Sequence, residues 1–177
     1  MLKSKLDDII REVPDFPKKG IKFKDITSLL LCSNECTEVL DFLVKKVTNI
    51  KLDAIVGIES RGFLFGFLLA NKLGVPFIPI RKSGKLPGET ISYKYDLEYG
   101  SSELEIHHND IKEGWDVLIH DDLLATGGTA VAAAELLKKS RANVAGFLFI
   151  VKLDYLQGEN KIKKYSNNIL GVLNYKN

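Results

Sequence analysis

The chain has 177 residues, of which 45% are hydrophobic and 27% are charged. That balance is typical of a folded globular protein, so we expect one domain over residues 1–177 rather than a disordered or fibrous chain. The net charge of +2 at pH 7 gives no reason to expect a nucleic-acid or membrane partner.

The N-terminal residues and the cysteines indicate the compartment. Asp7 and Asp8 stand where a secretory signal would need apolar residues, and the most apolar run, residues 63–70, is too short to span a bilayer. We therefore expect a cytoplasmic protein. Cys32 and Cys36 have no further cysteine or nearby histidine to complete a metal site. We expect two reduced thiols, with a redox pair as the less favoured alternative.

The first elements are predicted from apolar spacing. Apolar residues within 2–13 are spaced as on one face of a helix, which Pro14 and Pro17 would end. Residues 21–24 alternate between apolar side chains and lysine, as a short strand would. Residues 35–49 carry apolar residues at helical intervals and predict an amphipathic helix.

The middle of the chain predicts the unit from which parallel sheets are built. Residues 54–58 form a short apolar run, and a helical stretch follows from residue 63 to about 73. Gly74-Val75-Pro76 ends that helix, and residues 77–80 supply a second buried strand. Strand, helix and strand in this order favour a parallel sheet.

The second half predicts a loop, a hairpin and more strands. Residues 82–90 are polar and rich in glycine and proline, which is typical of a mobile loop. Apolar and polar residues alternate over 91–106 around a turn at 100–102, which predicts an antiparallel hairpin. Strands at 117–120 and 144–151 enclose a helix at 129–139. The fold class is therefore α/β, with an open, mostly parallel sheet flanked by helices and an antiparallel flap.

The clearest functional signal is the segment 117–129, VLIHDDLLATGGT. It places two acids at the end of a strand and two glycines before a helix, at the sheet edge where ligands bind in α/β proteins. Backbone N–H groups of Ala125–Thr129 can bind a phosphate at the helix N-terminus, and the acids can accept hydrogen bonds from sugar hydroxyls. A nucleoside-triphosphatase loop would need a lysine followed by serine or threonine after its last glycine. Here Thr129 and Ala130 follow Gly128, so that class is excluded. The alternative is a solvated strand end followed by a simple turn.

This segment resembles the phosphoribosyl-diphosphate signature of the type I phosphoribosyltransferase family. Other motifs resemble the same family in its order, over roughly residues 14–156. They are Phe16-Pro17 with Gly20, Phe23 to Ile26, Glu59 to Gly66, Arg81-Lys82 with Gly84 to Gly88, and Leu97 to Gly100. The resemblance also implies a small N-terminal hood over the sheet.

The resemblance is strongest to the members of the family that act on adenine. It implies that adenine and phosphoribosyl diphosphate give AMP and pyrophosphate, a purine salvage reaction. It also implies Mg²⁺ carried mainly by the substrate's oxygens, with no metal ligands from the protein, and a homodimer. The helix at 63–70 is apolar on nearly all sides, which agrees with burial against more than one partner.

The resemblance also assigns roles to residues. Glu98 is similar to the catalytic acid that manages the proton on the base nitrogen, and Tyr99 lies beside it in the flap. The phosphoribose site is assigned to Asp121, Asp122, Ala125, Thr126, Gly127, Gly128 and Thr129. The pyrophosphate site is assigned to Arg61, Arg81, Lys82 and Lys85. The base site is assigned to the Phe23 ring, the backbone of Lys22 and Lys24, and Leu153.

Some positions depart from the family pattern. Lys24 stands for an arginine, His120 for an apolar strand residue and Lys152 for an acid. We expect His120 to be structural rather than catalytic. Two other functions stay open: a transferase for a 6-oxopurine or another base, and a regulator that binds phosphoribosyl diphosphate without turnover. Retention of Glu98 and Arg61 argues against the regulator.

Overall fold

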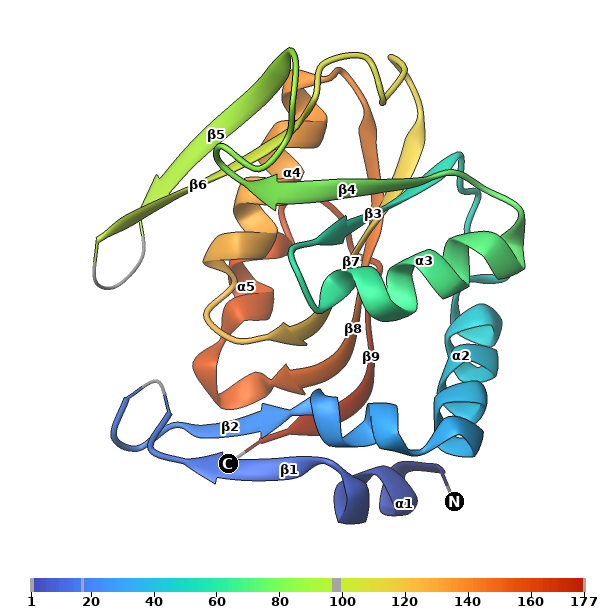
Figure 1. The fold of residues 1–177 in the computed structure, drawn as a ribbon, viewed down its shortest axis with the longest axis vertical. Helices are drawn as coiled ribbons and strands as arrows, with labels where there is room; N and C mark the ends of the chain where they lie inside the picture. The colour runs from blue at the N-terminus through green and yellow to red at the C-terminus, as the bar shows by residue number, and fades with distance from the viewer. Residues whose placement is uncertain (1, 17, 97–99, 177) are drawn as a thin grey trace.

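A computed structural model describes residues 2–16, 18–96 and 100–176. Its centre is a seven-stranded sheet with the order β5-β6-β4-β3-β7-β8-β9 (Figure 1). The five strands from β4 to β9 in that order are parallel, whereas β6 runs antiparallel to both β4 and β5. The predicted fold class, an open and mostly parallel sheet with an antiparallel flap, is therefore confirmed.

The sheet consists of β3 (Ala54–Ile58), β4 (Phe77–Lys82), β5 (Thr90–Asp96), β6 (Ser101–His107), β7 (Asp116–Leu124), β8 (Asn143–Leu153) and β9 (Ile169–Tyr175). A separate antiparallel pair is formed by β1 (Arg11–Pro14) and β2 (Lys22–Asp25). The helices are α1 (Leu2–Ile9), η1 (Ile26–Leu31), α2 (Ser33–Val47), α3 (Gly62–Leu73), α4 (Gly128–Lys139), η2 (Asp154–Leu156) and α5 (Gly158–Ile162).

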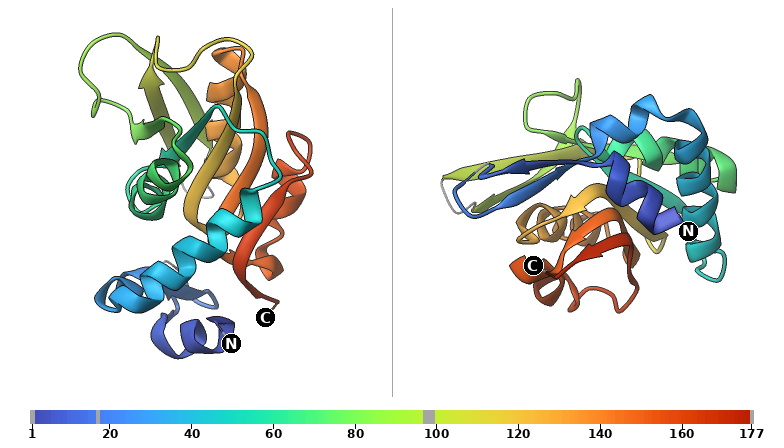
Figure 2. Two further views of the ribbon diagram at one scale, coloured as in Figure 1. Left: turned by 90° about the vertical axis from the view of Figure 1, so that its right-hand side faces the viewer. Right: turned by 90° about the horizontal axis from the view of Figure 1, so that it is seen from below.

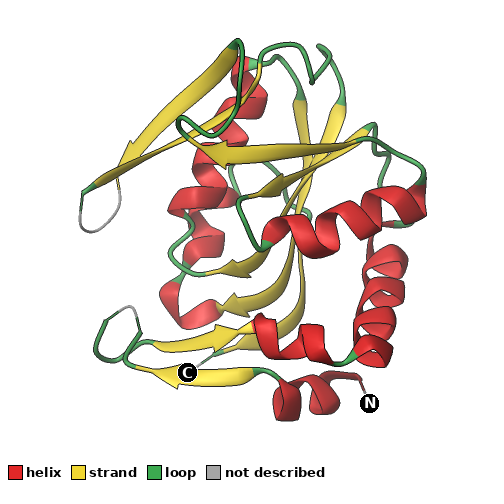
Figure 3. Ribbon diagram, in the orientation of Figure 1, coloured by secondary structure: helices red, strands yellow, loops and turns green. Residues whose placement is uncertain are grey.

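Helices cover both faces of the sheet, with α1, α2 and α3 on one side and α4 and α5 on the other (Figures 2 and 3). Successive strand residues face opposite cores. Ile55 packs with the first group of helices and Val56 with the second, and Leu118 and Ile119 divide in the same way. Burial on both faces explains why the central strands are almost continuously apolar in sequence.

The structure corrects the expected N-terminal helix. The helix predicted over residues 2–13 ends at Ile9, and residues 11–14 form β1 instead. Val13, which matched the helical spacing, pairs with Phe23 of β2. Two causes oppose the helix here. Pro14 restricts the preceding residue to an extended backbone, and residues 11–14 pair with β2.

Two strands differ from the prediction, one in length and one in its presence. β7 continues past residue 120 to Leu124, because Asp121 pairs with Phe149 and Leu123 with Val151 of β8. Asp121 and Asp122 therefore lie within the last paired residues of β7 rather than after the strand. β9 was not predicted at all, because Gly171 and Asn174 interrupt its alternation.

The arrangement creates one functional edge. The carboxyl ends of the parallel strands lie between the β5–β6 hairpin and the β1–β2 hairpin (Figure 1). The β1–β2 pair occupies the place of the expected hood. No helix of the described residues is long and apolar enough to cross a membrane.

Candidate active site

A cleft of about 480 Å³ opens at this edge. It gathers residues from the β3–α3 connection, the end of β4, the flap, the end of β7 and the β7–α4 connection. All seven residues assigned to phosphoribose line it, namely Asp121, Asp122, Ala125, Thr126, Gly127, Gly128 and Thr129. Arg61 and Lys82 line it as well. Six other residues with assigned roles are described by the structure but do not line the cleft, namely Arg81, Lys85, Lys22, Phe23, Lys24 and Leu153.

The phosphate loop, residues 125–129, joins β7 to α4. Gly127 is the N-cap of α4 and has a left-handed backbone with φ of 82°, which favours glycine. There is also no room for a side chain at Gly127, because an added Cβ would lie 2.6 Å from the carbonyl oxygen of Gly158. The first N–H groups of α4 have no partners within the helix and are available to an anion. The Thr129 hydroxyl lies 3.4 Å from that of Tyr95 on β5.

The two acids differ in their surroundings. Asp122 is 4% exposed, and its Oδ2 accepts a hydrogen bond from Nε of Arg61 at 2.5 Å. Oδ1 of Asp121 accepts the backbone N–H of Asp122 at 2.9 Å. Burial, and then the carboxylate of Asp122, raise the pKa of Asp121 well above its usual value, while Arg61 opposes the shift. The pair therefore favours ligands that supply hydroxyl donors or positive charge.

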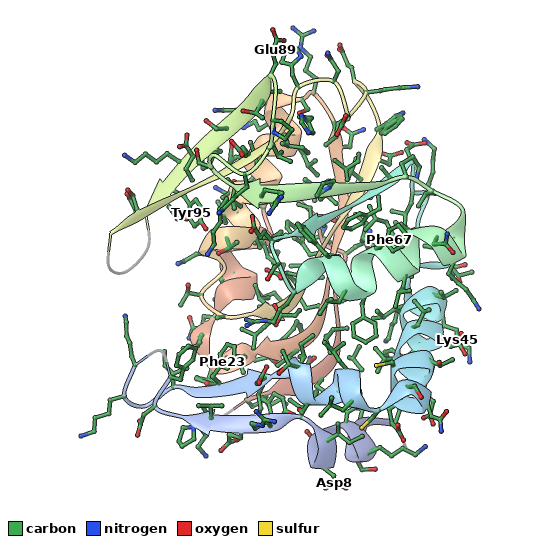
Figure 4. All side chains as sticks on the ribbon, in the orientation of Figure 1. Asp8, Phe23, Lys45, Phe67, Glu89 and Tyr95 are labelled. Atoms are coloured by element: carbon green, nitrogen blue, oxygen red, sulfur yellow. The ribbon has the colours of Figure 1, made fainter. Side chains whose placement is uncertain are left out.

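Arg61 connects the acids to the N-terminal hairpin. Its guanidinium lies 5.2 Å from the centroid of the Phe23 ring, and Phe23 packs edge-on against Phe16 at 5.1 Å. Phe23, predicted to stack on the base, is thus joined to the cleft through Arg61. Figure 4 labels Phe23 on this hairpin and Tyr95 on the flap. Arg61, expected at pyrophosphate, is bonded to Asp122 in this structure.

Arg81 and Lys82 are organised by Glu59. The carboxylate of Glu59 accepts hydrogen bonds from Nε and Nη2 of Arg81 at 3.2 and 3.3 Å, and from the backbone N–H of Lys82 at 2.8 Å. The hydrogen bond from Arg81 is the main reason why the pKa of Glu59 is lowered. The Lys82 side chain reaches the cleft and makes no ion pair with any described residue, so it is available to an anionic group.

The loop that follows, residues 83–89, is anchored rather than free. Oε1 of Glu105 on β6 accepts the backbone N–H groups of Lys85 and Leu86, both at 2.8 Å. Glu105 is only 5% exposed. Burial alone would raise the pKa of Glu105, but these N–H groups hold it lower. Sequence reasoning missed Glu105, because an acid on an alternating strand usually faces solvent.

The remaining base-site residues lie apart from the phosphate loop. Nζ of Lys24 pairs with Glu12 at 2.8 Å and lies 4.3 Å from the centroid of the Tyr175 ring. Leu153 is 2% exposed and packs in the core at the end of β8. Lys22 is exposed on β2. Glu98 and Tyr99 lie outside the described residues.

His120 supports the strand and does not line the cleft. Its ring is fully buried, with Nδ1 2.9 Å from the carbonyl oxygen of Leu148, and it lies beneath Gly66 of α3. Burial lowers the pKa of His120 to about 4, so the ring is neutral at pH 7. Among the described residues, no group of three or more His, Cys, Asp or Glu side chains could hold a metal ion.

The comparisons agree with this geometry. A family model described as "Phosphoribosyl transferase domain" matches residues 24–172. The chain therefore belongs to the phosphoribosyl transferase family. It is 48% identical over 170 residues to an adenine phosphoribosyltransferase of Trichodesmium erythraeum, covering 96% of this chain and 99% of that one.

Solved structures give the same result. The adenine phosphoribosyltransferase of Thermoanaerobacter pseudethanolicus superposes with a TM-score of 0.93 at 46% identity, covering 99% and 100% of the two chains. That of Saccharomyces cerevisiae, complexed with an imino-altritol bisphosphate and adenine, superposes with a TM-score of 0.85 at 40% identity, covering 96% of each chain. Within the family, these relatives place the chain among the adenine phosphoribosyltransferases.

Proposed function

We propose that this enzyme transfers the 5-phosphoribosyl group of phosphoribosyl diphosphate to adenine, giving AMP and pyrophosphate in purine salvage. The observation that carries the proposal is the cleft in which the phosphate loop, the acids Asp121 and Asp122, and the cations Arg61 and Lys82 meet. The solved relative from Saccharomyces cerevisiae holds adenine and a bisphosphate sugar analogue, which supports adenine as the acceptor.

The cleft's charges suit the transition state. The bond between C1 and the pyrophosphate oxygen breaks, a bond from a ring nitrogen of adenine to C1 forms, and that nitrogen loses its proton. Positive charge develops on the ribose ring and negative charge on the departing pyrophosphate. Asp121 and Asp122 lie where the ribose would bind, and their carboxylates stabilise the positive charge. Lys82 offers a cation to pyrophosphate.

The remaining roles follow the same assignment. Glu98 handles the proton of the base nitrogen, with Tyr99 beside it. Arg61 exchanges its bond to Asp122 for the substrate, and Arg81 and Lys85 approach pyrophosphate when loop 83–89 closes and excludes water. Phe23 stacks on the base while the backbone of Lys22 and Lys24 and the side chain of Leu153 complete its pocket.

Mg²⁺ fits this scheme as an ion bound to the substrate. Of the three carboxylates that line the cleft, Glu59 is already paired with Arg81 and Asp122 with Arg61, which leaves few protein oxygens for a hard cation. Mg²⁺ prefers phosphate oxygens and water in such sites. Bound there, the ion neutralises charge on the leaving pyrophosphate.

The proposal includes a homodimer in the cytoplasm. Leu64, Phe67 and Leu68 on the outer face of α3 are 38%, 57% and 45% exposed, and they border an apolar groove of about 500 Å³. Phe67 is labelled on α3 in Figure 4. A second copy of the chain would remove this face from water. Light scattering that gave a monomer at working concentration would contradict the dimer.

The two cysteines, both free thiols, suit a reducing compartment such as the cytoplasm.

A panel of bases tests the reaction. Adenine, guanine and hypoxanthine are each incubated with phosphoribosyl diphosphate and Mg²⁺, and nucleotide and pyrophosphate are measured. AMP from adenine alone is the expected result. Nucleotide from guanine or hypoxanthine would instead show a 6-oxopurine transferase, and binding without turnover would show a regulator. Glu98→Gln is expected to lower kcat far more than it weakens substrate binding.

A further inference from the structure

The back of the phosphate loop rests directly on a second stretch of backbone. An added Cβ on Gly158 would overlap the carbonyl oxygen of Ala125 and lie 2.8 Å from the amide nitrogen of Gly127. In the other direction, an added Cβ on Gly127 would lie 2.6 Å from the carbonyl oxygen of Gly158. No side chain separates the two backbones, so the position of Gly158 sets how far the loop can move away from its ligand.

Gly158 is held in place by its own short helix. It is the first residue of α5, which has five residues and is too short to be stable by itself. Tertiary contacts must therefore hold α5. Ile162 is fully buried in the core beside α4. At the other end, Oε2 of Glu159, the residue next to Gly158, accepts a hydrogen bond from Nζ of Lys152 at 2.6 Å.

Lys152 has an unusual environment for a lysine. Its side chain is only 7% exposed, whereas that of Glu159 is 44% exposed. Besides Glu159, Asp154 lies 3.9 Å from the ammonium group. A buried ammonium group is costly unless it is paired with an anion, so the Lys152–Glu159 bond strongly restricts where α5 can lie.

Lys152 also touches the strand that enters the loop. In the register of β7 and β8 it stands opposite Leu124, and Leu124 immediately precedes the phosphate loop. The ion pair thus joins the strand that leads into the loop to the helix behind it. Neither Lys152 nor Glu159 lines the described cleft.

We propose that Lys152 and Glu159 are positioning residues for the phosphate loop. Their ion pair keeps Gly158 against Gly127, so that the amide groups of the loop converge on the 5′-phosphate of the sugar. The proposal rests on the proposed function, because it assumes that this loop binds that phosphate. It concerns the phosphoribosyl substrate alone and is independent of which base accepts the sugar.

Two variants separate positioning from stability. Glu159→Gln removes the anion from a half-exposed position. Lys152→Met removes the buried charge and fills its space with an apolar chain, so stability should be kept or increased. Both variants are expected to raise the KM for phosphoribosyl diphosphate and the Kd for ribose 5-phosphate on the order of tenfold. The KM for adenine and the kcat at saturating substrate should change less than about twofold on the same grounds.

The matched control is Glu113→Gln, which breaks an exposed ion pair with Arg141 and should leave both constants unchanged. Ribose 5-phosphate binding is measured by calorimetry in the intact protein, and thermal unfolding is recorded for each variant. Calorimetry needs no turnover and no base, so a wrong acceptor base leaves this test intact. If both variants bind ribose 5-phosphate as tightly as the wild type, whatever their melting temperatures, the positioning role is wrong. Equal weakening by Glu113→Gln would also overturn it.

Discussion

The phosphate loop lines the cleft, whereas the loop at residues 83–89 follows the cleft residue Lys82, and the two loops use glycine for different reasons. In the phosphate loop, Gly127 is pressed against the backbone of Gly158. In the loop at residues 83–89, Gly84 and Gly88 have φ of 80° and 83°, but an added Cβ on either would meet nothing within 4 Å. The first loop needs glycine for space and for backbone conformation, whereas the second needs it for conformation alone.

The difference assigns the loops different mechanical roles. A loop packed against a second backbone keeps its amide groups in one arrangement, which suits a preorganised phosphate site. Loop 83–89 is held at Lys85 and Leu86 by Glu105 but has open space at Gly84 and Gly88, so the backbone at these two glycines can change its conformation, which suits a segment that closes over reacting groups. Substitutions in the two loops should therefore affect different steps.

The largest effect is expected for Gly127→Ala. The new methyl group would collide with Gly158, and the left-handed backbone adds about 1–2 kcal/mol of strain. We expect kcat/KM for phosphoribosyl diphosphate to fall by at least about 10³-fold, because the loop can no longer cup the phosphate. Steady-state kinetics and circular dichroism of the folded variant provide the measurement. Kinetics close to those of the wild type would show that the loop does not bind the phosphate.

A smaller effect, on a different step, is expected for Glu105→Ala. The N–H groups of Lys85 and Leu86 lose their acceptor, which costs about 1–3 kcal/mol where such groups are buried. With the loop misplaced, kcat should fall about 10- to 100-fold, while ribose 5-phosphate binds as in the wild type.

Glu105→Gln is the matched control for this anchor, because its amide oxygen can still accept the two N–H bonds. It should retain most of the activity. Should Glu105→Ala weaken ribose 5-phosphate binding as strongly as it lowers kcat, the two loops would not act separately.

The phosphate loop was predictable from sequence, and the anchors of both loops were not. Two acids and two glycines between a strand and a helix form a local pattern, so the segment Asp121 to Thr129 could be identified as a candidate phosphoribose site from sequence alone. Glu105 and Gly158 act only through contacts distant in sequence, and nothing in their neighbours reveals that the one turns inward and the other meets a loop. Lys152 was noticed only as a departure from the family pattern, in which an acid stands at this position, and its partner Glu159 was not noticed.

The folded protein should also lose stability in acid, because His120 is buried in β7, the strand that leads into the phosphate loop. Burial lowers the pKa of His120 to about 4, below the 6.5 expected in the unfolded chain, so the unfolded state takes up the proton first as the pH falls. The stabilisation is complete above about pH 6.5 and is lost progressively down to about pH 4, by about 3 kcal/mol in total.

His120→Leu removes this titration, and urea unfolding at pH 8, 6 and 5 measures it. The stability of the variant relative to the wild type should increase as the pH falls. His108→Gln, at an exposed position, is the control for the loss of a histidine. A pH-independent difference for His120→Leu would mean that the ring does not titrate as its burial requires.

The smallest effect is expected for Gly84→Ala, the counterpart of Gly127→Ala in the second loop. Both glycines have left-handed backbones, so both substitutions bring strain of about 1–2 kcal/mol. At Gly84 there is no collision to add, because the space around the new methyl group is open. The rate should fall only about fivefold, as that strain allows, and ribose 5-phosphate binding should not change. Equal losses at Gly84 and Gly127 would show that backbone conformation alone governs both loops, and that contact with Gly158 contributes nothing.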